Sequence, residues 1–81
     1  MIKTKLEFRN AYLAALKICH AKKPAEYCWP IANAEIVTDR MMVAIASNNY
    51  NLDSPALKLV ARTNRIPYNR KSIAEFYNSL I

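Results

Sequence analysis

The chain has 81 residues, which is enough for one domain with a single small core and leaves no room for a second core. Hydrophobic residues make up 53% of the chain, which excludes a disordered protein, and the complete absence of glycine argues against hairpin-rich β folds and glycine-rich phosphate loops. The formal net charge of +6 predicts attraction to nucleic acid, to an acidic protein surface or to anionic lipid.

No apolar run approaches the roughly 20 residues that a membrane span requires, and the first ten residues are charged where a signal peptide would be apolar. We therefore expect a cytoplasmic protein with no membrane partner. The two cysteines, Cys19 and Cys28, are expected to be reduced thiols, because no secretory signal accompanies them. A metal site built from these thiols and His20 would lack a fourth ligand, so we expect neither a metal nor a cofactor.

The first helix is predicted to begin at Thr4, because Thr4 and Glu7 have the spacing of a capping box. It should end near Lys22, before Pro24. Its buried stripe is predicted to comprise Phe8, Tyr12, Ala15, Leu16 and Cys19. For the cations near its end, Lys17, Lys22 and Lys23, we expect a structural role, since positive charge there offsets the helix dipole.

A second helix is predicted from about Ile31 or Asn33 to Ser47, after a connector between two prolines in which Trp29 anchors the core. The buried stripe of this helix is predicted to comprise Ile36, Val37, Met41, Ala44 and Ile45. The polar segment that follows is a turn, because Asn48 or its neighbour can end the helix in the left-handed conformation.

Two shorter helices are predicted in the last third of the chain. Ser54 and Pro55 have the preferences of a helix cap and a first helical position, and Asn64 should end this third helix before Pro67 prevents its continuation. Asn69 is expected to cap the last helix. The predicted buried faces are Ala56, Leu57, Val60 and Ala61 in the third helix and Ile73, Phe76, Tyr77 and Leu80 in the fourth. The sequence therefore predicts a single all-α domain over residues 1–81, a compact bundle of about four helices.

Positive charge is concentrated in this C-terminal helix pair. Five cations occur from Lys58 to Lys71 with no acidic residue between them. The segment ALKLVARTNRIPYNRKSIAEF resembles the helix-turn-helix of small phage and plasmid DNA-binding proteins. Ala61 stands where that motif has a small residue, Ile66 where it has an apolar residue after the turn, and Ile73 where its second helix packs back.

The resemblance implies that the last helix is a recognition helix, whose N-terminal residues approach base edges in the major groove. Arg70 and Lys71 are residue types that pair with guanine, and Asn69 could read adenine or bind phosphate. The cations of the third helix and the turn would contact phosphates, and Tyr68 could do either. The predicted nucleic-acid-binding residues are Lys58, Arg62, Arg65, Tyr68, Asn69, Arg70 and Lys71.

The sequence is compatible with two functions, and also with a solvent-exposed basic face that has no binding role. The first is a small regulator that binds double-stranded DNA, in which a homodimer would extend the few base pairs that one helix pair reads. The second is a phage-type inhibitor or adaptor that docks on an acidic host protein, for example in a nucleic-acid-processing or defence complex. Converging cations would favour the first, and an exposed apolar patch with Trp29, Tyr50 or Tyr68 would favour the second.

We do not expect an enzyme. The single histidine, His20, has no serine or acid near it in the sequence, and the six acidic residues are scattered without the spacing of a carboxylate pair. The sequence therefore predicts binding, and it predicts no catalytic residue.

Overall fold

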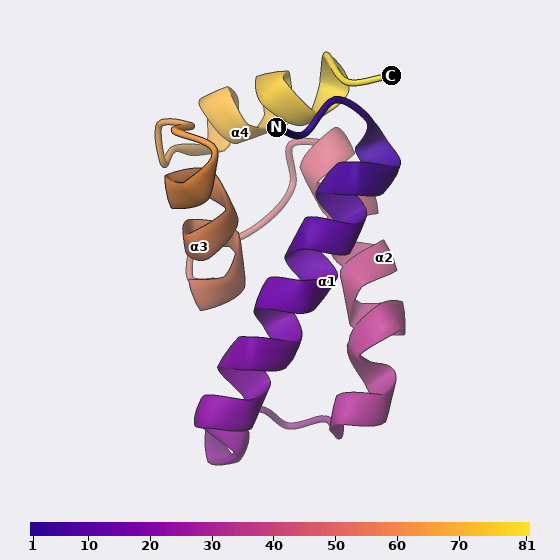
Figure 1. Cartoon of the computed structure of the whole chain (residues 1–81), viewed down its shortest axis with the longest axis vertical. Helices are drawn as coiled ribbons and strands as arrows, with labels where there is room; N and C mark the ends of the chain where they lie inside the picture. The colour runs from indigo at the N-terminus through magenta and orange to yellow at the C-terminus, as the bar shows by residue number, and fades with distance from the viewer.

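The computed structural model describes every residue from Met1 to Ile81 and contains four α-helices and no strand (Figure 1). The helices are α1, Lys5–Lys22; α2, Ala34–Ala46; α3, Pro55–Thr63; and α4, Arg70–Asn78. Two short 3₁₀ turns, Pro24–Glu26 and Ile31–Asn33, lie between α1 and α2. The predicted all-α fold of four helices is confirmed.

Three of the four helices, α1, α3 and α4, begin at residues whose side chains cap them, whereas Asn33 before α2 makes no side-chain cap. The Thr4 hydroxyl accepts a hydrogen bond from the Glu7 amide at 3.0 Å, and the Glu7 carboxylate accepts one from the Thr4 amide at 3.0 Å. Ser54 and Asn69 accept hydrogen bonds from first-turn amides of α3 and α4 at 3.2 and 2.8 Å. These side chains satisfy amides that a helix start leaves without partners. At the end of α2, Asn48 has a φ of 52°, as the predicted left-handed turn requires.

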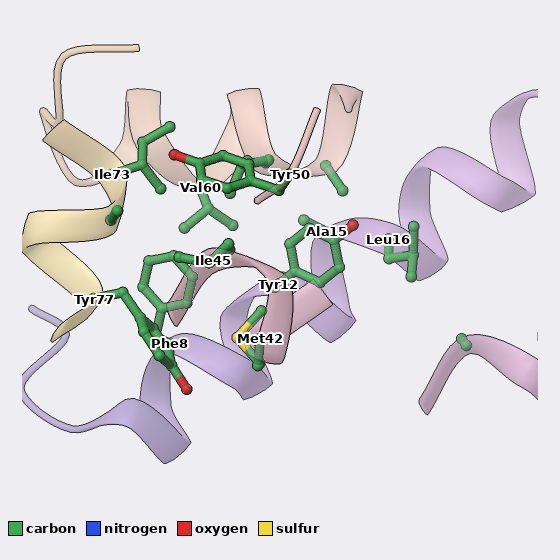
Figure 2. Close-up of a cluster of buried hydrophobic side chains, with 14 residues drawn as sticks. Phe8, Tyr12, Ala15, Leu16, Met42, Ile45, Tyr50, Val60, Ile73 and Tyr77 are labelled. Atoms are coloured by element: carbon green, nitrogen blue, oxygen red, sulfur yellow. The ribbon is translucent and has the colours of Figure 1, made fainter. Parts of the chain in front are cut away.

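The longest helix, α1, forms the centre of the molecule. It packs against α2 on one side and α3 on the other, and α4 crosses one end of the bundle, packing mainly against α2 (Figure 1). The buried side chains from all four helices meet in one core (Figure 2). Within that core, the Phe8 and Tyr77 rings contact edge to face with 5.2 Å between their centroids, which ties α4 to α1.

The buried face of α2 differs from the predicted one. Ile36 is 56% exposed. The residues of α2 that are buried are Ala34, Thr38, Met42 and Ile45. Ala34 and Thr38 are small residues on the buried row of α2, and burial of this row turns Ile36 outward. The prediction for Ile36 was wrong because hydrophobicity alone does not register that small residues are favoured where helices meet.

Two further differences concern Tyr50 and the buried face of α4. Tyr50 lies in the loop after α2 and is buried, although we did not predict it as a core residue. Phe76 and Leu80 are only partly buried on α4, where Ala74 is buried beside the predicted Ile73. The core therefore draws on the α2–α3 loop, which a helical periodicity cannot indicate.

Candidate nucleic-acid interface

A cavity of about 500 Å³ lies between the C-terminal end of α1, the end of the α2–α3 loop and α3. We call it the α1–α3 cavity. Three cations and one carboxylate line it, together with apolar side chains and the residues at the start of α3, Ser54 and Pro55. Its charged residues are Lys22, Asp53, Lys58 and Arg62, and its large apolar residues are Ile18, Leu52 and Leu59.

Helical spacing brings these residues together. Lys58 and Arg62 are four residues apart on α3, so they share the face that points away from the buried residues of this helix. Lys22 follows Ile18 by four residues on α1, and therefore lies on the same face of that helix. Ile18 is 49% exposed and Leu59 36% exposed, so the cations stand beside apolar surface that the fold leaves accessible to solvent.

The three cations of the α1–α3 cavity have no carboxylate partner within salt-bridge distance. The salt bridges of the protein are made instead by Arg9, Lys23 and Lys71. Lys58 Nζ lies 5.7 Å from the centroid of the Tyr68 ring, a cation–π contact that leaves its hydrogen-bonding protons free. The cavity therefore carries uncompensated positive charge, reduced only by Asp53.

Tyr68 supports this region from inside. Its hydroxyl donates to the backbone carbonyl of Leu52 and lies 3.3 Å from that of Ser54. Burial raises the pKa of the hydroxyl, which keeps it protonated and able to donate. The ring thus fixes the loop that lines the cavity and lies near Lys58, a structural role that leaves little of Tyr68 to meet a base.

The predicted base-reading residues at the start of α4 are engaged within the protein. The Asn69 side chain is the cap of the helix. The Arg70 guanidinium donates to the Asn48 carbonyl at 2.6 Å and lies 5.9 Å from the Tyr50 ring centroid. In return, the Tyr50 hydroxyl donates to the Arg70 carbonyl at 2.6 Å. We call this pair of interactions the Tyr50–Arg70 contact, and it fastens α4 to the α2–α3 loop.

The two remaining predicted residues lie apart from the α1–α3 cavity. Arg65 has a φ of 56°, a left-handed conformation, in the turn between α3 and α4. It lines a separate cavity of about 410 Å³ with residues of α4. Lys71 Nζ lies 3.9 Å from a Glu75 carboxylate oxygen at an exposed position. The structure thus places Lys58 and Arg62 at one cavity, with the Tyr68 ring beside Lys58. The other four predicted residues do not line this cavity.

Lys22 is the member of the cavity that the sequence prediction missed. Its place in the last turn of α1 suits the predicted role of offsetting the helix dipole. The packing of α1 against α3 adds a second role, because it brings Lys22 to the same cavity as Lys58 and Arg62. The pairing of Ile18 with Lys22 at a four-residue spacing was the one local signal of a partly apolar, cationic face.

The connector between α1 and α2 holds a separate aromatic cluster. His20 Nε2 lies 2.9 Å from the Trp29 carbonyl oxygen, and its ring centroid is 5.0 Å from that of Tyr27 and 4.9 Å from that of Trp29. Trp29 is partly buried and packs against the core, in the anchoring role that was predicted for it. Cys19 and Cys28 are free thiols, and no group of three or more metal-ligating side chains is present.

Comparisons of the chain with protein-family models, with curated proteins and with solved structures gave no match. In addition, no helix is both long enough and apolar enough to span a bilayer.

Proposed function

We propose that this protein binds nucleic acid, in the first place double-stranded DNA, through phosphate contacts made by α1 and α3. The observation that carries the proposal is the convergence of Lys22, Lys58 and Arg62 on one cavity without a salt bridge to any carboxylate. Ammonium and guanidinium groups that are free of internal partners can displace the counterions of a phosphate backbone, and this release supplies most of the affinity of non-specific binding.

The contacts within the protein bear on how DNA would be read. Arg70 and Asn69 already make intramolecular hydrogen bonds, so base recognition by them would first require breaking those bonds. The proposal therefore assigns the main role to phosphate contacts, with weak sequence preference. Arg65 and Lys71 lie outside the cavity and could extend the contact along a duplex. The helix-turn-helix resemblance and a homodimer remain predictions within this proposal, as does a cytoplasmic, non-catalytic role.

A salt titration tests the proposal. Wild-type protein and the Arg62→Gln and Arg40→Gln variants would be titrated onto a labelled duplex at several salt concentrations. Arg40 is the matched control, because it is an exposed arginine on α2 and does not line the cavity. In Figure 1, α2 and α3 lie on opposite sides of α1. Loss of one phosphate contact in Arg62→Gln should lower the slope of log K against log salt by about 0.9, while Arg40→Gln leaves it unchanged. Absence of binding at low salt would overturn the proposal.

One observation supports the alternative of a protein-binding inhibitor, and a second does not. Exposed Ile18 and Leu59 beside the cations would suit an acidic partner with an apolar edge. Of the three aromatic residues expected to favour this alternative, Tyr50 is buried, and Trp29 and Tyr68 are partly buried against the core. An acidic protein that competes with the duplex, and that needs Arg62 but not Arg40, would move the site to this alternative.

A further inference from the structure

We infer that the α1–α3 cavity accepts an unpaired nucleotide, so that the protein prefers nucleic acid with an unpaired base to a regular duplex. The inference rests on the proposed function and specifies its substrate. It starts from the combination of a cavity, cations and exposed apolar side chains at one place.

The volume of the cavity favours a ligand that is larger than a single phosphate group. Phosphates on the outside of a duplex can be bound by cations on a flat or convex surface and need no cavity. The α1–α3 cavity measures about 500 Å³, which lies within the range of about 300 to 1,000 Å³ typical of pockets that enclose small molecules. It is thus large enough to take more of a nucleotide than its phosphate.

The lining of the cavity is a further argument. Lys22, Lys58 and Arg62 suit the phosphate of a nucleotide. Ile18 and Leu59 offer partly exposed apolar walls, on which the flat face of a base can be covered from water. A nucleotide combines these two surfaces, one anionic and one apolar, whereas a phosphate alone or a purely apolar ligand matches only half of the lining.

The one carboxylate of the cavity, Asp53, also suits a nucleotide. Asp53 would repel a second phosphate in the cavity. As a hydrogen-bond acceptor it can instead receive an amino or imino proton from the edge of a base. A base within a regular duplex has its edge paired and its faces stacked, and its extrusion costs a few kcal/mol, so an already unpaired base enters at lower cost.

Three labelled probes separate this inference from the proposed function: a blunt duplex, the same duplex with a three-nucleotide overhang, and the overhang strand alone. Wild-type protein should bind the overhang duplex about tenfold tighter than the blunt one, because covering roughly 55 Å² of apolar surface is worth about a factor of ten. The single strand should also bind, and free deoxythymidine monophosphate should compete only at far higher concentration, since it lacks the neighbouring phosphates.

Two truncations of exposed apolar residues make the test specific. Leu59→Ala should reduce the overhang preference to about twofold, since the base would contact this wall. Val43→Ala is the matched control, because Val43 is 68% exposed on α2, away from the cavity, and should leave both affinities unchanged. Ile18→Ala repeats the test from the α1 side, and circular dichroism confirms that each variant is folded.

Each possible result supports or overturns at least one of two hypotheses, the proposed nucleic-acid binding and the unpaired-nucleotide inference. Equal affinity for blunt and overhang duplexes, or a preference that survives both Leu59→Ala and Ile18→Ala, overturns the unpaired-nucleotide inference and leaves the proposed function standing. Failure of every probe to bind at low salt overturns both. Free mononucleotide that binds more tightly than the overhang duplex would show a nucleotide pocket with no role for a strand, and would also overturn the inference.

Discussion

Two groups of cations in the C-terminal helix pair look alike in the sequence and differ in what they contact. In α3, Lys58 and Arg62 face a solvent-accessible cavity with no carboxylate partner. At the start of α4, Arg70 is hydrogen-bonded to the Asn48 carbonyl and lies near the Tyr50 ring. One group is available to a ligand, whereas the arginine of the other already stabilises the fold. Positive charge in a sequence therefore counts toward binding only after its internal partners are known.

The difference between the two groups predicts different effects of substitution, on affinity in one group and on stability in the other. Arg62 at the α1–α3 cavity should affect affinity and leave stability nearly unchanged, because a surface charge without a partner contributes little to folding. A residue of the Tyr50–Arg70 contact should do the reverse. Measuring stability and affinity on the same variants therefore tests both halves of the comparison.

The largest effect is expected when the aromatic half of the Tyr50–Arg70 contact is removed. Tyr50→Ala deletes a buried ring and the hydroxyl that donates to the Arg70 carbonyl, so we expect a loss of about 3 to 5 kcal/mol in the free energy of unfolding. Urea denaturation followed by circular dichroism measures it. Leu59→Ala, at an exposed position, is the control and should cost far less. A Tyr50→Ala protein as stable as wild type would show that the loop residue is not part of the core.

Replacing each of the two arginines, Arg70 and Arg62, by glutamine compares the cation that stabilises the fold with the cation at the cavity. Arg70→Gln should lower the free energy of unfolding by about 1 kcal/mol, through loss of the hydrogen bond to Asn48 and of the contact with the Tyr50 ring. Arg62→Gln should leave it within about 0.5 kcal/mol of wild type and weaken DNA binding. The division fails if Arg70→Gln reduces DNA affinity more than Arg62→Gln does while the protein stays folded.

The elements of the fold could be predicted because their signals are local. Thr4, Ser54 and Asn69 cap their helices as expected, and the whole predicted buried face of α3 is buried. A cap needs only neighbours within three residues, and an amphipathic stripe needs only one helix. For α2 the stripe failed at Ile36, because Ala34 and Thr38 lie at the contact instead.

The site was only partly predictable because it depends on contacts between distant segments. Lys58 and Arg62 were identified from the charge pattern, and they do share a cavity. Lys22 reaches that cavity only because α1 packs against α3, at a separation of more than 30 residues in the chain. The engagement of Arg70 depends likewise on the loop that holds Asn48 and Tyr50, which no local pattern places beside α4.

A smaller, pH-dependent effect sharpens the role of the Tyr50 hydroxyl. Burial raises the pKa of this group, and an acid whose pKa is raised by folding stabilises the protein below its unfolded pKa of about 10 and loses that contribution as the pH rises through the folded value. Tyr50→Phe should cost about 0.5 to 1 kcal/mol at neutral pH by removing the hydrogen bond to Arg70. Its stability should then decline less than that of wild type between pH 9 and 11, in urea melts across that range. An unchanged alkaline decline would mean that other buried tyrosines, such as Tyr12, dominate it.

The smallest effect concerns the one carboxylate at the α1–α3 cavity. Asp53 lies among three cations there, without a salt bridge to any of them, and it reduces the positive potential that a phosphate would meet. Asp53→Asn should therefore raise duplex affinity about two- to threefold at low salt, an effect that shrinks as salt screens exposed charges. Asp39→Asn is the matched control, because Asp39 lies on α2 beside Arg9, outside the cavity, and its loss should change affinity less. Equal gains from the two substitutions would show that only net charge matters, and the cavity would then lose its claim to be the place where the phosphate binds.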